Sequence, residues 1–152
     1  MNLIIFEGSD AVGKGVLLRS FRSYTRYQFV EMDRGHISRL VFAQYFKRPL
    51  YTSEKFRFNA EKEIKTFVKQ NNAVIAHVYA KKDVVFERMR LRGEDPTTEP
   101  DPETIATLID GLIDKLGLRD RCVSVDTSGD PDLEECAKKI YEKVKSVQKR
   151  RK

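Results

Sequence analysis

Hydrophobic residues along this chain follow two alternating patterns. Runs of consecutive apolar residues bounded by glycine, asparagine or aspartate are typical of strands buried on both faces of a sheet. These runs predict strands at residues 2–7, 28–32, 73–79 and 122–125. Because the run at 73–79 is apolar almost throughout, we expect it in the middle of the sheet.

The segments between these runs carry apolar residues at the spacings of helices. A helix of about 13 residues should follow the first strand. Its inner side should carry Val16, Leu17, Leu18 and Phe21. Further helices are predicted at residues 37–46, 53–70, 83–92 and 102–116. Asp130 and Pro131 should cap the last helix, because Asp is a favoured N-cap and Pro suits a first helical turn.

Alternation of strands and helices predicts an α/β fold with a parallel sheet. With right-handed crossovers, the sheet has about four strands in the order 2-1-3-4 and helices on both faces, a three-layer sandwich. In such sheets ligands bind at the carboxyl ends of the strands. We therefore expect the site there.

Composition limits the organisation of the chain. At 152 residues, 40% hydrophobic and 34% charged, it should form a single soluble domain over residues 1–152. Its apolar stretches are too short for a membrane span and the first strand starts at once, so we expect a cytoplasmic protein, in the host cytoplasm if it is viral. Cys122 and Cys136 fit neither a metal site nor a disulfide scaffold and should be reduced core thiols.

The chain is basic, with a net charge of +6 and a pI near 9.3. This charge favours anionic ligands, either nucleotides or nucleic acid. Residues 149–152, Lys-Arg-Arg-Lys, form a basic tail. A solvated helix end explains it, since cations are favoured near a helix C-terminus, and nucleic-acid binding stays open as the less favoured reading.

Residues 8–15, Gly-Ser-Asp-Ala-Val-Gly-Lys-Gly, form a glycine loop directly behind the first strand. Its glycines let backbone N–H groups converge on phosphate oxygens, Lys14 adds a positive charge, and the following helix presents its positive end. The loop therefore predicts a nucleoside triphosphate site. Its contacts should be Gly8, Asp10, Ala11, Val12, Gly13, Lys14, Gly15 and Val16.

One residue departs from the usual phosphate-binding pattern. A Ser or Thr normally follows the lysine and holds Mg²⁺ through its hydroxyl, whereas Gly15 and Val16 stand here. We therefore expect Mg²⁺ to be held by other groups or through water.

Asp33 and Arg34 follow the second strand and should face the glycine loop. The carboxylate can organise Mg²⁺ through water or accept a proton from an attacking hydroxyl. The guanidinium can clamp a second phosphate. The alternative is a helix cap followed by a surface arginine.

Arg88 and Arg92 lie one turn apart on one predicted helix face. Two like charges on one face repel each other unless an anion lies between them, which favours a phosphate partner; a solvated helix face is the alternative. Residues 93–101 have two prolines and no core-forming side chain, so they should be mobile and face solvent. Residues 88–101 would then form a lid segment.

Taken together, these motifs resemble the thymidylate kinase-like group of P-loop kinases, over nearly the whole chain. The matching segments are residues 6–14, residues 33–34 with Ser38 behind them, residues 88–95 and residues 126–129. The resemblance implies a P-loop NTPase fold with ATP phosphates on Lys14, the acceptor phosphate and metal near Asp33 and Arg34, and an arginine lid. By the same resemblance, Asp10 approaches the acceptor's sugar and the backbone near Thr127 lies against adenine.

The chain is shorter than members of that group. A strand and helix that usually lie between the phosphate loop and the Asp-Arg pair have no counterpart, so other residues would have to supply the acceptor contacts of this unit. Arg57, Phe56 and Phe58 offer replacements, but the two phenylalanines cannot point to the same side of a helix. A phage-type or otherwise minimal member of the group would fit.

We expect an ATP- and Mg²⁺-dependent phosphotransferase that acts on a nucleotide, a deoxynucleoside monophosphate being the first choice. Its catalytic residues would be Lys14, Asp33, Arg34, Arg88 and Arg92. A first alternative is a kinase for the 5′-hydroxyl of a nucleoside or polynucleotide, with Asp33 or Glu31 as the base. A second is a nucleotide-binding protein without transfer activity, which Val16 supports. A homodimer is left open, and no membrane partner is expected.

Two histidines lie near these elements. His77, in an apolar strand, should be a hydrogen-bonded core residue rather than a base, and His36 should be more exposed.

Overall fold

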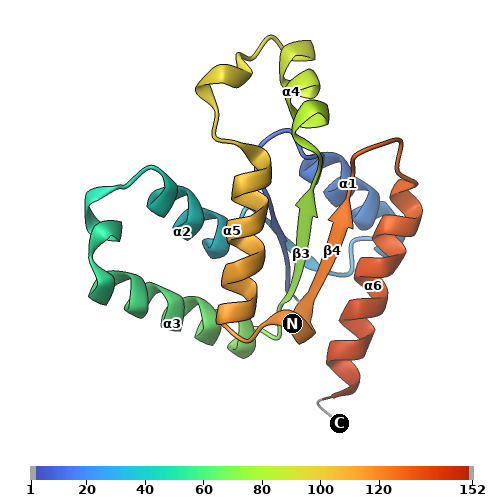
Figure 1. The fold of residues 1–152 in the computed structure, drawn as a ribbon. Helices are drawn as coiled ribbons and strands as arrows, with labels where there is room; N and C mark the ends of the chain where they lie inside the picture. The colour runs from blue at the N-terminus through green and yellow to red at the C-terminus, as the bar shows by residue number, and fades with distance from the viewer. Residues whose placement is uncertain (1–2, 151–152) are drawn as a thin grey trace.

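The computed structural model describes residues 3–150 (Figure 1). Four strands are present: β1 Leu3–Glu7, β2 Val30–Asp33, β3 Val74–Tyr79 and β4 Cys122–Asp126. Six α-helices connect or follow them: α1 Lys14–Thr25, α2 His36–Tyr45, α3 Glu54–Gln70, α4 Lys82–Leu91, α5 Pro102–Lys115 and α6 Leu133–Lys149. Short 3-10 turns lie at η1 Pro49–Thr52, η2 Pro96–Thr98 and η3 Arg119–Arg121. The predicted start of the first strand at Asn2, and Arg151 and Lys152 of the basic tail, lie outside the described residues.

The strands form one parallel sheet in the order β2-β1-β3-β4, as the sequence predicts. Ile5 of β1 pairs with Met32 on one side and Ile75 on the other, and Ile75 pairs with Cys122. β1 and β3 are therefore interior strands, which explains their continuous apolar sequences. All carboxyl ends lie at one edge, and α4 stands beyond it (Figure 1).

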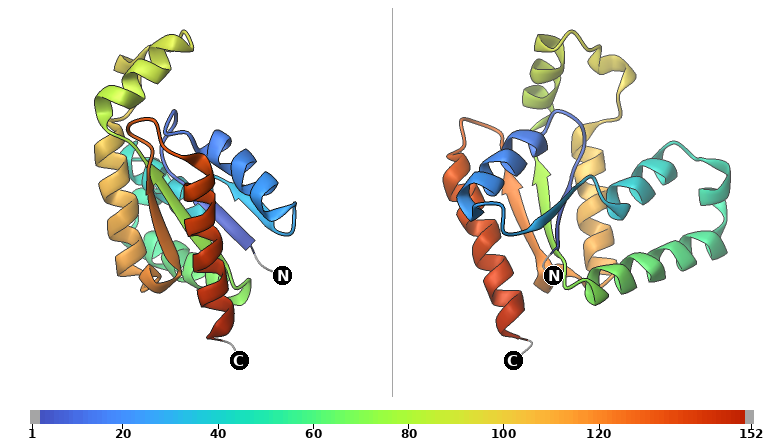
Figure 2. Two further views of the ribbon diagram at one scale, coloured as in Figure 1. Left: turned by 90° about the vertical axis from the view of Figure 1, so that its right-hand side faces the viewer. Right: turned by 180° about the vertical axis from the view of Figure 1, so that it is seen from behind.

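Helices cover both faces of the sheet (Figure 2). On one face, α1 and α6 pack over the alternate strand residues Ile4, Phe6, Val74, Ala76 and Val78. On the other, α2, α3 and α5 pack over Leu3, Ile5, Ile75 and Cys122. This is a three-layer α/β arrangement, and its two apolar layers follow from the two-residue period of the strands.

One residue predicted on the inner side of α1 is exposed. Leu17, Leu18 and Phe21 are buried, but 46% of Val16 is accessible to solvent. Successive helical residues are about 100° apart, which places Val16 on the opposite side from Leu17 and Phe21. The sequence-based assignment of Val16 to the core is therefore wrong.

Side chains cap the starts of α3, α5 and α6. Ser53 caps α3 and Asp101 caps α5, next to the starts predicted for these helices. For α6 the capping residue is Asp132, whose side chain accepts hydrogen bonds from the N–H groups of Glu134 and Glu135. The prediction of Asp130 and Pro131 as the cap is wrong by a few residues, because Asp132 has the matching offset to the first helical N–H groups.

Residues 93–101 are not uniformly exposed. Asp95 caps η2 by accepting from the N–H of Thr97, and Pro96 and Pro100 are buried. The expectation that this stretch faces solvent throughout is therefore wrong, since its prolines supply apolar surface. Within residues 3–150, no helix is both long and apolar enough to cross a membrane.

Both cysteines are free and buried, as predicted. His77 is also buried, but neither of its ring nitrogens has a hydrogen-bond partner among the described residues. The prediction of a hydrogen-bonded histidine is therefore wrong. Burial lowers its pKa to about 4, with Asp110 opposing the shift and Arg119 adding to it.

Candidate functional site

The glycine loop leaves β1 and lies against the end of β3. Gly8 has φ +152°, and a Cβ there would come within 2.2 Å of the carbonyl oxygen of Val78. Gly13 has φ +89° and Ala11 has φ 57°. Only glycine fits at position 8 without moving the backbone of β3. The loop thus turns tightly at the edge where the strands end.

Lys14 is the first residue of α1, and its side chain is buried inside the glycine loop. Its Nζ donates hydrogen bonds to the carbonyl oxygens of Gly8, at 3.0 Å, and Ser9, at 2.5 Å. Burial and the nearby Arg34 lower the pKa of Lys14, whereas Asp33 and other carboxylates raise it. The ammonium therefore sits at the positive end of α1, within electrostatic reach of the residues that end β2.

Arg34 turns back from β2 toward the glycine loop. Its backbone N–H donates to the carbonyl of Phe6 at 2.8 Å, and its φ is 60°. Its guanidinium pairs with the carboxylate of Asp10 and lies 5.4 Å from the centre of the Phe42 ring. Two residues predicted to contact ligands are thus in direct contact with each other. Asp33 is exposed beside them.

Glu7, the last residue of β1, has a structural role that our sequence analysis missed. Its carboxylate is buried and accepts hydrogen bonds from the N–H groups of Gly35, Ile37 and Ser38, at 3.2, 3.2 and 3.0 Å, and from the hydroxyl of Ser38. Burial raises the pKa of Glu7, and these hydrogen bonds oppose the shift. A carboxylate at the start of α2 also interacts favourably with the helix dipole.

Ser38 extends this contact to the glycine loop. Its hydroxyl accepts a hydrogen bond from the N–H of Gly8 at 3.2 Å. The start of α2, the end of β1 and the first residue of the loop are therefore joined through Glu7 and Ser38. An acidic residue that ends an otherwise apolar strand, directly before a glycine, was the sequence signal for this role.

Arg88 reaches the glycine loop from α4. Its guanidinium donates to the carbonyl of Ala11 at 3.3 Å, to the Thr127 hydroxyl at 3.1 Å and to the Thr127 carbonyl at 2.6 Å. The Thr127 hydroxyl donates to the carbonyl of Val12 at 2.5 Å. Arg88 and Thr127 thus contact each other and the glycine loop.

Arg92 does not join this group. It ends α4, and its guanidinium pairs with Glu94 at 3.2 Å. Half of its side chain is exposed, and within residues 3–150 it makes no hydrogen bond to the loop, although it lines the cavity beside the loop together with Arg88.

A cavity of about 440 Å³ adjoins the glycine loop on the α1 side of the sheet. Apolar side chains line much of it, and Arg88 and Thr127 close one wall. Its apolar lining residues include Val16, Leu91, Pro131 and Leu133. The exposed position of Val16 on α1 therefore makes it part of this cavity wall.

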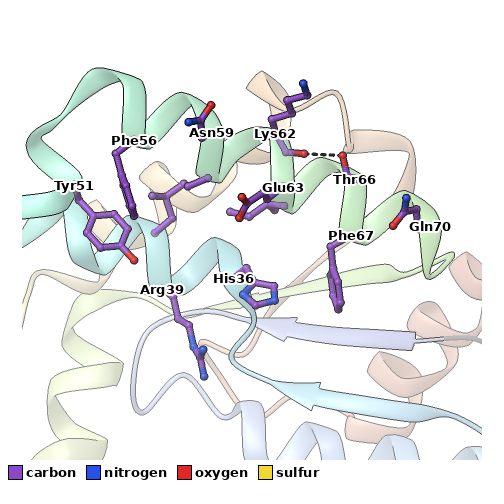
Figure 3. Close-up of a pocket in the computed structure, with 13 residues that line it drawn as sticks. His36, Arg39, Tyr51, Phe56, Asn59, Lys62, Glu63, Thr66, Phe67 and Gln70 are labelled. Atoms are coloured by element: carbon purple, nitrogen blue, oxygen red, sulfur yellow. Dashed lines mark hydrogen bonds between the residues drawn. The ribbon is translucent and has the colours of Figure 1, made fainter.

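A second cavity, of about 810 Å³, lies between α2 and α3. Figure 3 shows Tyr51 and Phe56 at one end of it and His36 and Phe67 at the other. The rings of Tyr51 and Phe56 are 4.9 Å apart, and those of His36 and Phe67 are 5.1 Å apart.

Phe58 is 66% exposed and lies, with Arg57, along a different groove between α3 and α5. The two phenylalanines point apart, as predicted.

The groups that could hold Mg²⁺ are few. No cluster of three His, Cys, Asp or Glu side chains suited to a metal occurs among residues 3–150. Asp10 is engaged by Arg34, and position 15 offers no hydroxyl. Asp33 is the exposed carboxylate at the loop, which fits a Mg²⁺ ion that arrives with phosphate oxygens and keeps most of its waters.

Comparison of the chain with models of protein families, with curated proteins and with solved structures finds no significant match.

Proposed function

We propose that this protein is a P-loop kinase that transfers the γ-phosphoryl group of ATP to a nucleotide, with a deoxynucleoside monophosphate as the first candidate acceptor. One observation carries the proposal. Three cationic side chains meet at the glycine loop: Lys14 from α1, Arg34 from the turn after β2 and Arg88 from α4. Arg34 is paired with Asp10, whereas Lys14 and Arg88 contact carbonyl and hydroxyl oxygens, so a bound polyanion would neutralise charge that the protein itself leaves unbalanced.

The donor would bind along the glycine loop and the start of α1. Lys14 would exchange the carbonyls of Gly8 and Ser9 for phosphate oxygens, and the backbone N–H groups of the loop would complete the cradle. The cavity beside Val16 and Arg88 offers an apolar wall and a guanidinium plane for the base. Thr127 borders that cavity, so its backbone would lie against adenine in this arrangement.

The acceptor would bind on the side of α2. Arg34 is held by Asp10 at the mouth of the loop, where a guanidinium can clamp the acceptor's phosphate. The cavity between α2 and α3 begins at His36, two residues after Arg34. Its rings, including Phe56 and Phe67, offer stacking surfaces for the acceptor's base.

Transfer would then be an in-line displacement. An oxygen of the acceptor phosphate attacks the γ-phosphorus, the bond between the γ-phosphorus and the bridging oxygen breaks, and ADP leaves. Lys14 and Arg34 would neutralise charge on the transferred group and hold both substrates in line. When bound, Mg²⁺ would add charge neutralisation between the phosphates, with Asp33 positioning its waters. Arg92 would contribute its charge only after its ion pair with Glu94 has broken.

A kinase for 5′-hydroxyl groups is the second candidate, because the exposed carboxylate of Asp33 can accept a proton. Glu31, the other base that we considered, is paired with Arg22 at 3.2 Å and its side chain is 8% exposed. The structure therefore favours Asp33 over Glu31 for this role.

A panel of acceptors with radiolabelled ATP tests the proposal. We expect label on deoxynucleoside monophosphates and none on nucleosides or on oligonucleotides with a 5′-hydroxyl. Label on the 5′-hydroxyl substrates alone would support the second candidate. Binding of ATP with no labelled acceptor would leave a nucleotide-binding protein without transfer activity.

A further inference from the structure

Arg19 lies over the position in α1 where the usual hydroxyl is missing. Gly15 is the second residue of this helix, and Arg19 follows it one turn later on the same side. A Cβ added to Gly15 would have a nitrogen of the Arg19 guanidinium at 3.8 Å, and apart from its chain neighbours and the backbone of its own helix no other atom would lie within 4 Å. The arginine side chain therefore runs back toward the start of α1, the direction in which helical side chains lean.

The Arg19 guanidinium has no partner in the part of the chain that the structure describes. Arg22, Arg34 and Arg88 each contact a carboxylate or a carbonyl, whereas Arg19 takes part in no ion pair or hydrogen bond within residues 3–150. The first turn of α1 contains no acidic residue. A cation near the positive end of a helix is unfavourable by itself, but an anion bound between the two is attracted by both.

The same surroundings offer little to a metal ion. Gly15 has no hydroxyl, and no cluster of three potential metal ligands occurs among residues 3–150. A guanidinium, by contrast, is permanently charged and matches phosphate oxygens with two parallel donors.

We infer that Arg19 binds the phosphate chain of the nucleoside triphosphate above Gly15 and supplies there the positive charge that a hydroxyl-held Mg²⁺ would otherwise provide. This rests on the proposed function, because it requires a triphosphate in the glycine loop. It makes nucleotide binding depend only weakly on Mg²⁺.

Calorimetric titration of the full chain with ATP, in EDTA and in Mg²⁺, tests the inference. Wild type should bind ATP with affinities within about threefold in the two conditions. Arg19→Gln should lose about tenfold in EDTA, the usual effect of one charged hydrogen bond. Arg26→Gln is the matched control, since it removes the same charge from an exposed position at the other end of α1. Adding Gly15→Ser to Arg19→Gln should restore affinity in Mg²⁺ but not in EDTA.

Equal affinities of Arg19→Gln and Arg26→Gln in EDTA would overturn the inference and leave the kinase proposal in place. A wild type that binds ATP only with Mg²⁺ would overturn it as well. ATP binding that needs Arg19, without transfer to any acceptor, would overturn the kinase proposal alone. Absence of ATP binding in both conditions would overturn both.

Discussion

The carboxylate of Glu7 lies directly against Gly35, and this contact sets how closely the start of α2 approaches β1. The N–H of Gly35 donates to Glu7 at 3.2 Å, and a Cβ on Gly35 would lie 2.5 Å from the same carboxylate and 2.4 Å from the side chain of Ile5. Arg34 precedes Gly35 by one residue. The placement of Arg34 at the glycine loop thus depends on the absence of a side chain at position 35.

Gly35→Ala should therefore destabilise the protein by about 2 kcal/mol, since the added methyl group forces buried atoms apart. Gly111→Ala is the matched control, because nothing outside the adjoining backbone of α5 lies within 4 Å of a Cβ at this position. Replacing a mid-helix glycine in open space should stabilise by up to about 1 kcal/mol. Urea denaturation of both variants measures the free energies of unfolding. If neither substitution changed the free energy of unfolding, the close contact between Gly35 and Glu7 would be wrong.

Lys14→Ala should abolish phosphoryl transfer and leave the fold intact. The ammonium is the charge closest to the bound phosphates in our proposal, and loss of such a group costs about a hundredfold or more in turnover. Lys69→Ala, an exposed change at the end of α3, serves as the control. Turnover is measured with labelled ATP, and circular dichroism checks the fold. Unchanged turnover of a folded Lys14→Ala protein would refute the assignment of the active site.

Arg88→Ala and Arg92→Ala should have different effects. Arg88 contacts Ala11 and Thr127 beside the donor cavity, so its loss should weaken ATP binding about tenfold. Arg92 is partnered by Glu94 and would act only in the closed complex, so its loss should lower kcat more than ATP affinity.

Arg90→Ala, on the exposed side of the same helix, controls for loss of charge from α4. Calorimetry gives the ATP affinity and steady-state kinetics gives kcat. A fall in affinity with kcat preserved for Arg92→Ala would argue against its role in a lid.

Stability should fall at mildly acid pH because of His77. Its pKa is lowered from 6.5 to about 4 in the folded protein, so the unfolded chain takes up the proton first. The loss of folding stability begins as the pH falls below 6.5, is complete near pH 4 and reaches about 3 kcal/mol. Above pH 6.5 the imidazole is neutral in both the folded and the unfolded chain, so it has no effect on stability.

Urea denaturation of wild type and His77→Gln at pH 7.5, 6 and 4.5 separates this effect from that of the carboxylates. The difference in stability between the two proteins should change by about 2 kcal/mol across the range in favour of the variant. If the free energies of unfolding of wild type and His77→Gln changed in parallel with pH, His77 would not titrate as expected.

Much of the fold could be predicted because it depends on local patterns. The apolar runs of the four strands, and the apolar spacing within α3 and α5, are properties of short segments. The order β2-β1-β3-β4 followed from right-handed crossovers between them. The same periodicity, applied more strictly, would have placed Val16 on the outer side of α1.

The sequence by itself determined the glycine loop and its position at the end of β1, since both are contiguous in the chain. Only the tertiary structure decided which distant side chains meet there: Arg34 pairs with Asp10, Arg88 docks on Thr127, and Arg92 pairs with Glu94 rather than with the loop. The burial of Glu7 at the start of α2 was decided in the same way. These contacts join residues far apart in sequence, and their geometry depends on how helices pack on the sheet, which no local pattern of residues encodes.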